Sequence, residues 1–135
     1  MRTVRVDPAK KTAVLTALHT LTFPSDEIPT WKHDATWLVM DNGEPVAFLY
    51  AEDVGDNTLY FSRVGVLPSH RGKGVQAKLM AKLEAHAKAE GYEVIISTTL
   101  NNLPSANSFI KRGWRLYDPA APWAWEGTLY WRHQL

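Results

Sequence analysis

The chain is 135 residues long, 45% of its residues are hydrophobic, and its formal net charge is +1 at pH 7. This length suits one hydrophobic core, so we expect a single domain over residues 1–135, and the balanced charge argues against a nucleic-acid partner. The chain contains no cysteine, which excludes disulfides, thiolate nucleophiles and thiolate-bound zinc, and we expect no metal site.

The N-terminal third of the chain predicts a strand, a helix and a loop. Residues 3–6 predict a short edge strand, and Asp7-Pro8 then predicts a helix start, with Asp as N-cap and Pro in the first turn. The two prolines within residues 23–29 predict a loop or a short broken helix. The helix that starts at Asp7-Pro8 has one apolar face, formed by Val14, Leu15, Leu18 and Leu21.

A hairpin is predicted over residues 36–52, because two apolar runs flank the turn sequence Asp41-Asn42-Gly43-Glu44. A further strand is expected from Thr58 to Val66. Arg63 is unusual within this apolar strand. Its side chain either extends to solvent at an edge or reaches a bound phosphate, and the sequence does not decide between the two.

The C-terminal half predicts alternating helices and strands. An apolar stripe starting at Val75 indicates a helix that ends before Gly91, and residues 93–97 form a β-branched strand. Asn101 or Asn102 is expected to cap a helix that ends near Arg112. Two final strands are predicted over residues 114–117 and 127–132.

The segment between the strand at Val66 and the helix at Val75 contains a basic glycine turn, Arg71-Gly72-Lys73-Gly74. Turn amides and a helix N-terminus together attract anions, and glycine lets a ligand approach the backbone closely. The turn therefore predicts a phosphate or pyrophosphate site, or else an ordinary glycine-rich connection.

Two familiar phosphate-binding patterns do not fit this turn. A nucleotide P-loop requires a glycine five positions before Gly72 and a Ser or Thr after Lys73, where this chain has Leu67 and Gly74. A dinucleotide fingerprint requires an acidic residue at the end of the next strand, which here ends in Ser-Thr-Thr. A NAD-linked enzyme is therefore a distant alternative.

The pattern V-x-P-x-x-R-G-x-G-V at residues 66–75 resembles the acyl-CoA-binding motif of the GNAT superfamily of N-acyltransferases. Residues 102–114 resemble that family's N-x-x-S/A…Y-x-K-x-G-F segment, and the resemblance extends from about Thr36 to Trp114. It implies an α/β (α+β) fold: a mixed, mostly antiparallel sheet of about six or seven strands with about four helices, splayed at the acyl-CoA cleft. The residues that it implies for cofactor binding are Val64, Val66, Arg71, Gly72, Lys73, Gly74, Val75, Gln76, Asn102, Ser105 and Phe109.

The resemblance further implies acetyl-CoA-dependent transfer of an acetyl group to a primary amine by direct attack on the thioester. An alkyl ammonium must first lose a proton, and Glu52, Asp53 and Glu27 are the candidate bases, although each also suits an ordinary turn or surface carboxylate. Phe109 stands where the family often has a tyrosine that protonates the departing thiolate. Tyr60, Tyr117 or Ser105 is expected to supply that proton, unless the thiolate leaves unaided.

The acceptor is a small-molecule or protein amine. Glu27 and Trp31 are candidate contacts to a cationic acceptor, but they equally suit a solvated loop and a core tryptophan. A non-catalytic acyl-CoA-binding or regulatory domain of the same fold is the alternative function, which Phe109 makes plausible. Since no apolar run is long enough to span a membrane and no signal peptide is evident, we expect a cytoplasmic protein without a membrane partner. The sequence leaves a homodimer open.

Overall fold

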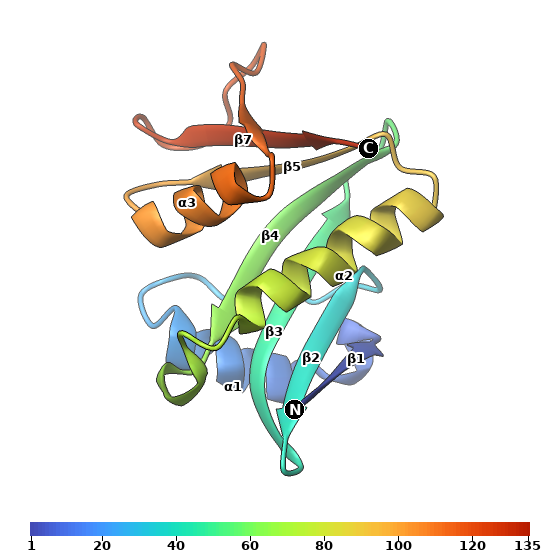
Figure 1. The fold of residues 1–135 in the computed structure, drawn as a ribbon, viewed down its shortest axis with the longest axis vertical. Coiled ribbons are helices and arrows are strands. Elements are labelled where there is room, and N and C mark those ends of the chain that lie inside the picture. The colour runs from blue at the N-terminus through green and yellow to red at the C-terminus, as the bar shows by residue number, and fades with distance from the viewer. The chain divides into compact units, whose positions relative to one another are not determined.

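The computed structural model describes residues 1–135, which form two compact units. The N-terminal unit comprises Met1–Glu52 and Arg63–Leu83, and the C-terminal unit comprises Asp53–Ser62 and Glu84–Leu135. Figure 1 labels their elements. The strands form a mostly antiparallel seven-stranded sheet in the order β1-β2-β3-β4-β5-β7-β6, with three α-helices and two short 3-10 helices. The predicted mixed α/β fold class is confirmed, with these five helical segments where about four helices were expected.

Three antiparallel strands build the sheet of the N-terminal unit: β1 (Arg2–Val6), β2 (Thr36–Asp41) and β3 (Glu44–Asp53). The β2–β3 turn has φ +51° at Asn42 and +79° at Gly43, and two successive positive φ values are typical of a type I′ hairpin turn. The predicted hairpin is confirmed.

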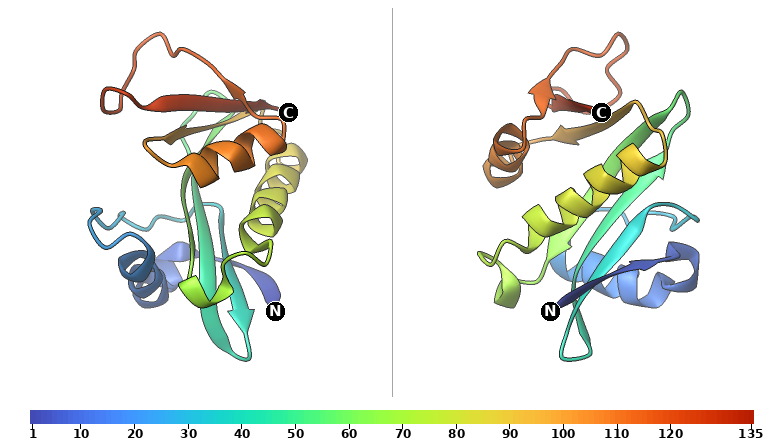
Figure 2. Two further views of the ribbon diagram at one scale, coloured as in Figure 1. Left: turned by 60° about the vertical axis from the view of Figure 1, so that its left-hand side comes forward. Right: turned by 45° about the vertical axis from the view of Figure 1, so that its right-hand side comes forward.

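The helix predicted from Asp7 divides into two pieces. A 3-10 helix covers Pro8–Lys10, where Asp7 Oδ1 accepts the Ala9 N–H at 3.1 Å, and α1 covers Thr12–Thr22. No helix forms at residues 23–29, where the two prolines leave a loop. In Figure 2, α1 and the start of α2 lie on opposite faces of the sheet of the N-terminal unit. The core beneath α1 is formed by Leu15, Leu18, Leu38, Phe48 and Tyr50.

The glycine turn follows strand β4 (Thr58–Val66), as predicted, and leads through a 3-10 helix at Pro68–His70 into α2 (Val75–Ala89). At the far end of α2, Gly91 has φ +81° and the Tyr92 N–H donates to the Ala87 carbonyl at 3.0 Å. This hydrogen bond and the left-handed glycine form a Schellman end, as expected of a glycine just past a helix.

The C-terminal unit contains β5 (Val94–Thr99), α3 (Leu103–Lys111), β6 (Arg115–Leu116) and β7 (Leu129–Gln134). Strands β4 and β5 pair in parallel, whereas β7 pairs antiparallel with both β5 and β6. β7 starts and ends two residues later than the prediction.

Neighbouring residues of a strand face opposite sides of its sheet, and those of β7 have different partners. The Trp131 ring packs against Phe109 of α3, with centroids 5.4 Å apart. The Tyr130 ring instead packs against Trp123 of the β6–β7 loop at 4.7 Å. No helix of the chain combines the length and the apolar composition that a membrane crossing demands.

Candidate functional site

The glycine turn of the N-terminal unit has the backbone that anion binding requires. Gly72 and Gly74 have φ +75° and +74°, a left-handed conformation that any other residue adopts only with strain. A Cβ on either glycine would meet nothing within 4 Å, so the turn is open. These glycines are therefore required by backbone conformation, not by tight packing.

The amides of this turn are available to a ligand. The Arg71 N–H makes only a long bond of 3.4 Å to the Pro68 carbonyl, and the amides of Gly72, Lys73 and Gly74 donate to no acceptor in the chain. The Gly74 carbonyl accepts the Lys78 N–H at 3.1 Å, which makes Gly74 the N-cap of α2. The first amides of a helix have no acceptor within it and carry partial positive charge. Several donors therefore occur in succession, beside the exposed side chains of Arg71 and Lys73.

The side chain of Arg71 folds back onto the end of β4. Its Nε donates to the Val66 carbonyl at 3.0 Å. Val66 is one of the two β4 residues expected to pair with the cofactor, and both Val64 and Val66 are half-buried. The arginine thus links the turn to the strand end that precedes it.

The turn is also held by the histidine that directly precedes Arg71. His70 Nε2 lies 2.8 Å from Asp41 Oδ2, and His70 Nδ1 lies 2.7 Å from Ser69 Oγ. The hydrogen bond from His70 holds the pKa of the Asp41 carboxyl below its ordinary value. The Met1 ammonium lies 3.9 Å from the other oxygen of Asp41. The β2–β3 hairpin therefore anchors the glycine turn through one imidazole.

The structure gives Arg63 a partner that was neither of its two expected ones, solvent or a bound phosphate. Its Nη1 bonds Asp26 Oδ2 at 2.9 Å, and its guanidinium carbon lies 5.4 Å from the centre of the Phe23 ring. Arg63 directly precedes Val64 on β4, so it holds the loop after α1 against this strand. Because its charge is paired with this arginine, Asp26 is not an isolated carboxylate for a cationic acceptor.

The candidate base Glu52 is half-buried at the end of β3. Its carboxylate oxygen lies 3.3 Å from the hydroxyl of Tyr50. Burial raises the pKa of Tyr50 to about 12, so this phenol stays neutral and can donate to the carboxylate. Glu27, the other candidate of this unit, lies in the exposed loop after α1.

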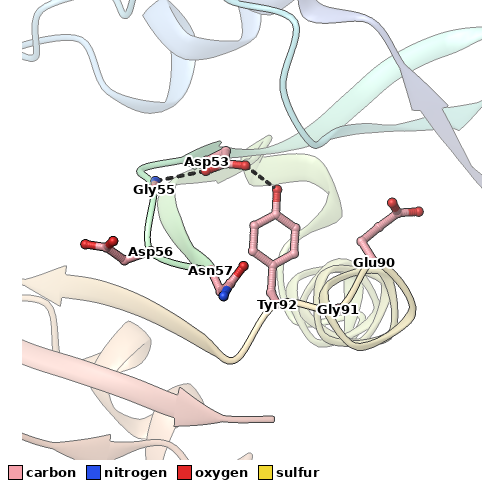
Figure 3. A pocket seen from close by; sticks show the side chains of 7 residues that line it. All are labelled: Asp53, Gly55, Asp56, Asn57, Glu90, Gly91 and Tyr92. Carbon is pink, nitrogen blue, oxygen red and sulfur yellow. Dashed lines mark hydrogen bonds between the residues drawn. The ribbon is translucent and has the colours of Figure 1, made fainter.

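Asp53 is the third candidate base, and its carboxylate is used to shape the β3–β4 turn. Figure 3 shows Asp53 between the Gly55 N–H and the Tyr92 hydroxyl, each 2.9 Å away. These two hydrogen bonds, the one from Gly55 foremost, hold the pKa of Asp53 below its ordinary value. A lowered pKa makes a carboxylate a weaker base. The surrounding hollow of about 340 Å³ is polar, and in Figure 3 Asp56 and Glu90 point away from each other.

Trp31 is a packing residue of the N-terminal unit. Its indole Nε1 donates to Thr16 Oγ1 at 3.0 Å, and its ring meets Tyr50 edge-on at 5.0 Å. Both contacts fix the tryptophan against the core beneath α1. A direct contact between Trp31 and an acceptor stays a prediction.

In the C-terminal unit, one aromatic cluster contains both tyrosines named as candidate acids. Tyr60 meets Trp123 edge-on at 6.5 Å, Trp123 meets Tyr130 at 4.7 Å, and Tyr130 meets Tyr117 at 6.3 Å. The Tyr60 hydroxyl lies 3.3 Å from Thr98 Oγ1. Burial raises the pKa of Tyr117, although the nearby charge of Arg132 opposes this rise. Tyr117 therefore keeps its proton at neutral pH and can donate it.

Helix α3 carries the remaining predicted cofactor residues. Asn102 caps it, because its Oδ1 accepts the Ser105 N–H at 3.1 Å. Phe109 is buried between Trp114 and Trp131, with ring centroids 4.5 and 5.4 Å away. Phe109 thus contributes to the packing of α3 and has no hydroxyl to give.

A side-chain hydrogen bond follows the last residue pair of the parallel β4–β5 ladder. That ladder runs from Thr58–Val94 to Tyr60–Ile96. One residue further on, the buried hydroxyl of Ser97 donates to the Phe61 carbonyl at 2.8 Å. The only sequence signal for this hydrogen bond is a serine that follows β-branched residues within the strand.

A family model described as the acetyltransferase (GNAT) family matches residues 13–114, well over half of the chain. The chain belongs to the GNAT family.

Solved structures with the same fold cover almost the entire GNAT chain. IAA acetyltransferase from Bacillus cereus has a TM-score of 0.80 at 19% identity, covering 99% of both chains. An acetyltransferase from Bacillus subtilis in complex with CoA has a TM-score of 0.79 at 16% identity, covering 99% of this chain and 98% of that one. A GNAT acetyltransferase from Elizabethkingia anophelis with acetyl-CoA bound also has a TM-score of 0.79 at 16% identity, covering 99% of this chain and 97% of that one. At these identities the likeness concerns the fold.

The predicted site residues of this GNAT chain fall into two groups. Val64, Val66, residues 71–76 and Glu52 belong to the N-terminal unit, together with Glu27 and Trp31. Tyr60 and Tyr117 belong to the C-terminal unit and share its aromatic cluster, and that unit also carries Asn102, Ser105 and Phe109. The role of each residue toward acyl-CoA stays a prediction.

Proposed function

We propose that this GNAT chain is an acetyl-CoA-dependent N-acetyltransferase that acts on a primary amine. The observation that carries the proposal is the turn before α2, whose two left-handed glycines and unpaired amides suit a diphosphate. Arg71 and Lys73 add positive charge there. That structural neighbours were solved with CoA or acetyl-CoA supports the same ligand for this chain.

The turn and its helix N-terminus would hold the diphosphate of acetyl-CoA, and the main chain of Val64 and Val66 would pair with the pantetheine arm. The Val66 N–H would polarise the thioester carbonyl. Removing one such donor costs roughly 3–4 kcal/mol of barrier in other enzymes. On the second unit, Asn102, Ser105 and Phe109 are the proposed cofactor contacts.

Acetyl transfer would proceed in one displacement without an acetyl-enzyme. The amine nitrogen forms a bond to the acetyl carbon, the carbon–sulfur bond breaks, and CoA leaves as a thiolate. Glu52 is the proposed acceptor of the proton that the ammonium must lose, because its half-buried carboxylate has only a neutral phenol as its hydrogen-bond neighbour. Tyr117 or Tyr60 is proposed to protonate the thiolate, because Phe109 has no proton to give.

A thiol-release assay with a panel of primary amines tests this function. We expect acetyl-CoA to raise the melting temperature, and at least one amine to release CoA thiol in step with an acetylated product. A burst of thiol release without amine would contradict direct attack. If acetyl-CoA stabilises the protein but no amine is acetylated, the protein is instead a non-catalytic acyl-CoA-binding domain, which the buried phenylalanine at residue 109 would favour.

A further inference from the structure

A basic hollow lies at the open end of the β6–β7 ladder in the C-terminal unit. It encloses about 440 Å³ and is lined by Gly113, Arg115, Arg132, His133 and Gln134. None of these residues belongs to the glycine turn, and the proposed acetyl transfer uses none of them. A Cβ on Gly113 would meet nothing within 4 Å, so this wall of the hollow is open.

Two arginines face each other directly across this ladder. Arg115 of β6 is the register partner of Arg132 of β7, so the two side chains leave the sheet on the same face. Like charges directly opposite in a sheet are destabilising. This chain therefore has an unfavourable charge pair at an exposed position.

No carboxylate of the chain compensates this charge. The side chain of Arg115 makes no hydrogen bond or ion pair, and the contact of the Arg132 side chain is with the Tyr117 ring, 5.2 Å from its guanidinium carbon. Glu84 lies close enough to His133 to interact electrostatically. Its two oxygens are already bonded to Arg112, at 2.7 and 2.8 Å, and one also accepts the Trp114 N–H at 3.0 Å.

The remaining groups of the hollow also suit an anion. Gln134 stands two residues after Arg132 on β7, so it shares the face of the arginine pair. Its amide nitrogen donates to the Glu93 carbonyl at 3.3 Å, which holds the side chain at the strand end. Guanidinium groups present paired N–H donors that match phosphate oxygens, and two of them balance a dianion.

We propose that the Arg115–Arg132 hollow binds a phosphate group, either as free inorganic phosphate or as a phosphate monoester. The bound dianion removes the repulsion between the two guanidinium groups and takes the N–H donors that the chain leaves unused. This site is additional to the diphosphate site proposed at the glycine turn.

Thermal unfolding of the full chain tests the site with inorganic phosphate as the probe. We expect ~20 mM phosphate to raise the melting temperature by about 3 °C more than sodium chloride of equal ionic strength. Arg115→Gln should lose most of this difference, and without phosphate it should melt at the same temperature as the unmodified chain or higher. Lys111→Gln removes an exposed cation of α3 and should keep the full response. Because these variants keep the glycine turn, phosphate bound there contributes equally to each and cancels.

NMR spectra of the arginine side chains provide a second measurement that needs no variant. Titration with phosphate should shift the Nε–Hε signals of Arg115 and Arg132, whereas chloride should not. Phenyl phosphate shifting them at lower concentration than inorganic phosphate would identify a monoester as the ligand, and the reverse order would identify the free ion. The proposal is wrong if chloride stabilises as much as phosphate, if Arg115→Gln retains the response, or if neither arginine signal moves.

Discussion

The imidazole of His70 bonds the carboxylate of Asp41 at 2.8 Å, and this contact connects the glycine turn to a hairpin residue 29 positions earlier in the chain. The other imidazole nitrogen meets Ser69 Oγ, so both ring nitrogens have partners and the ring has one orientation. His70 closes the 3-10 helix immediately before Arg71. The hydrogen bond therefore restricts the conformations of the turn whose amides are proposed to bind acyl-CoA.

Asp41→Ala should weaken CoA binding without touching a residue of the turn. We expect the dissociation constant to rise about two- to tenfold, the usual effect of one hydrogen bond. Asp41→Asn should restore most of the affinity, because its amide oxygen can still accept from Nε2. Asp56→Ala, in the exposed β3–β4 turn, is the control for charge loss. Calorimetric titration measures all three variants, and equal affinities for Asp41→Ala and the unmodified chain would show that the anchor has no role in binding.

Gly74→Ala should separate the cost in stability from the cost in ligand binding. Gly74 and Gly43 have nearly the same φ, +74° and +79°, and both lie in open space. Alanine at either position should therefore destabilise the fold by a similar amount, about 1 kcal/mol. Only Gly74→Ala should also reduce CoA affinity, because it disturbs the amides before α2. Denaturant unfolding and CoA titration of the pair check this, and equal affinity in both variants would contradict the role of the turn.

Gly65→Ala should destabilise the N-terminal unit through packing. A Cβ on Gly65 would lie 2.6 Å from Phe48 Cε1 and would also collide with the Thr22 side chain. Overfilling a packed core of this kind costs about 1–3 kcal/mol. Unfolding in urea measures the loss. The double variant with Thr22→Ala should recover part of it, and if it recovers none, the collision with Thr22 does not cause the loss.

His19 should make the stability of the chain depend on pH. Burial lowers the pKa of His19, the positive charge of Arg63 lowers it further, and Asp26 partly opposes them. Neither ring nitrogen has a hydrogen-bond partner. The unfolded chain therefore binds this proton more readily, so the stability present above the ordinary histidine pKa of about 6.5 is lost as the pH falls from that value toward the lower pKa of the folded state.

The His19→Leu variant isolates this effect from the other four histidines, since the chain has 5 in total. Free energies of unfolding measured between about pH 5 and 8 should fall more steeply toward acid for the unmodified chain than for His19→Leu. Parallel curves would show that His19 titrates in the folded protein as it does in the unfolded one.

A general acid, if the enzyme uses one, should be identifiable by single substitution. Among Tyr60→Phe, Tyr117→Phe and Ser105→Ala, one should lower kcat at least about tenfold, because a positioned general acid typically contributes about 10²- to 10⁴-fold. The KM for acetyl-CoA should change less in that variant. If all three keep their kcat, the CoA thiolate leaves without a specific proton donor.

Features with a local cause were predictable from the sequence. The hairpin at Asn42-Gly43 and the Gly91 helix end depend on left-handed backbone, which few residues adopt. The glycine turn follows the same rule, and its spacing from Pro68 indicated the family. Asn102 caps α3 because its short side chain reaches an amide three residues on.

Long-range pairings were not predictable. Nothing near Asp41 in the sequence indicates that its carboxylate meets His70. The hairpin turn depends on the backbone of its central residues, Asn42 and Gly43, and does not require the side chain of Asp41. Arg63 could have extended to solvent or reached a phosphate, and only the folded loop after α1 brings Asp26 to it. The division of the predicted helix at Lys11 was not predictable either. Lys11 has φ −129°, which is not a helical value, and no residue type at this position indicates such a break.

Titration of the protein with CoA and, separately, with pantetheine tests the diphosphate site most directly. Pantetheine retains the thiol-bearing arm but lacks the diphosphate that the amides of residues 71–76 are proposed to hold. We expect CoA to bind with measurable heat and pantetheine to bind far more weakly, with the gap shrinking in Gly74→Ala. Equal affinities for the two ligands, or no heat with CoA, would contradict the account.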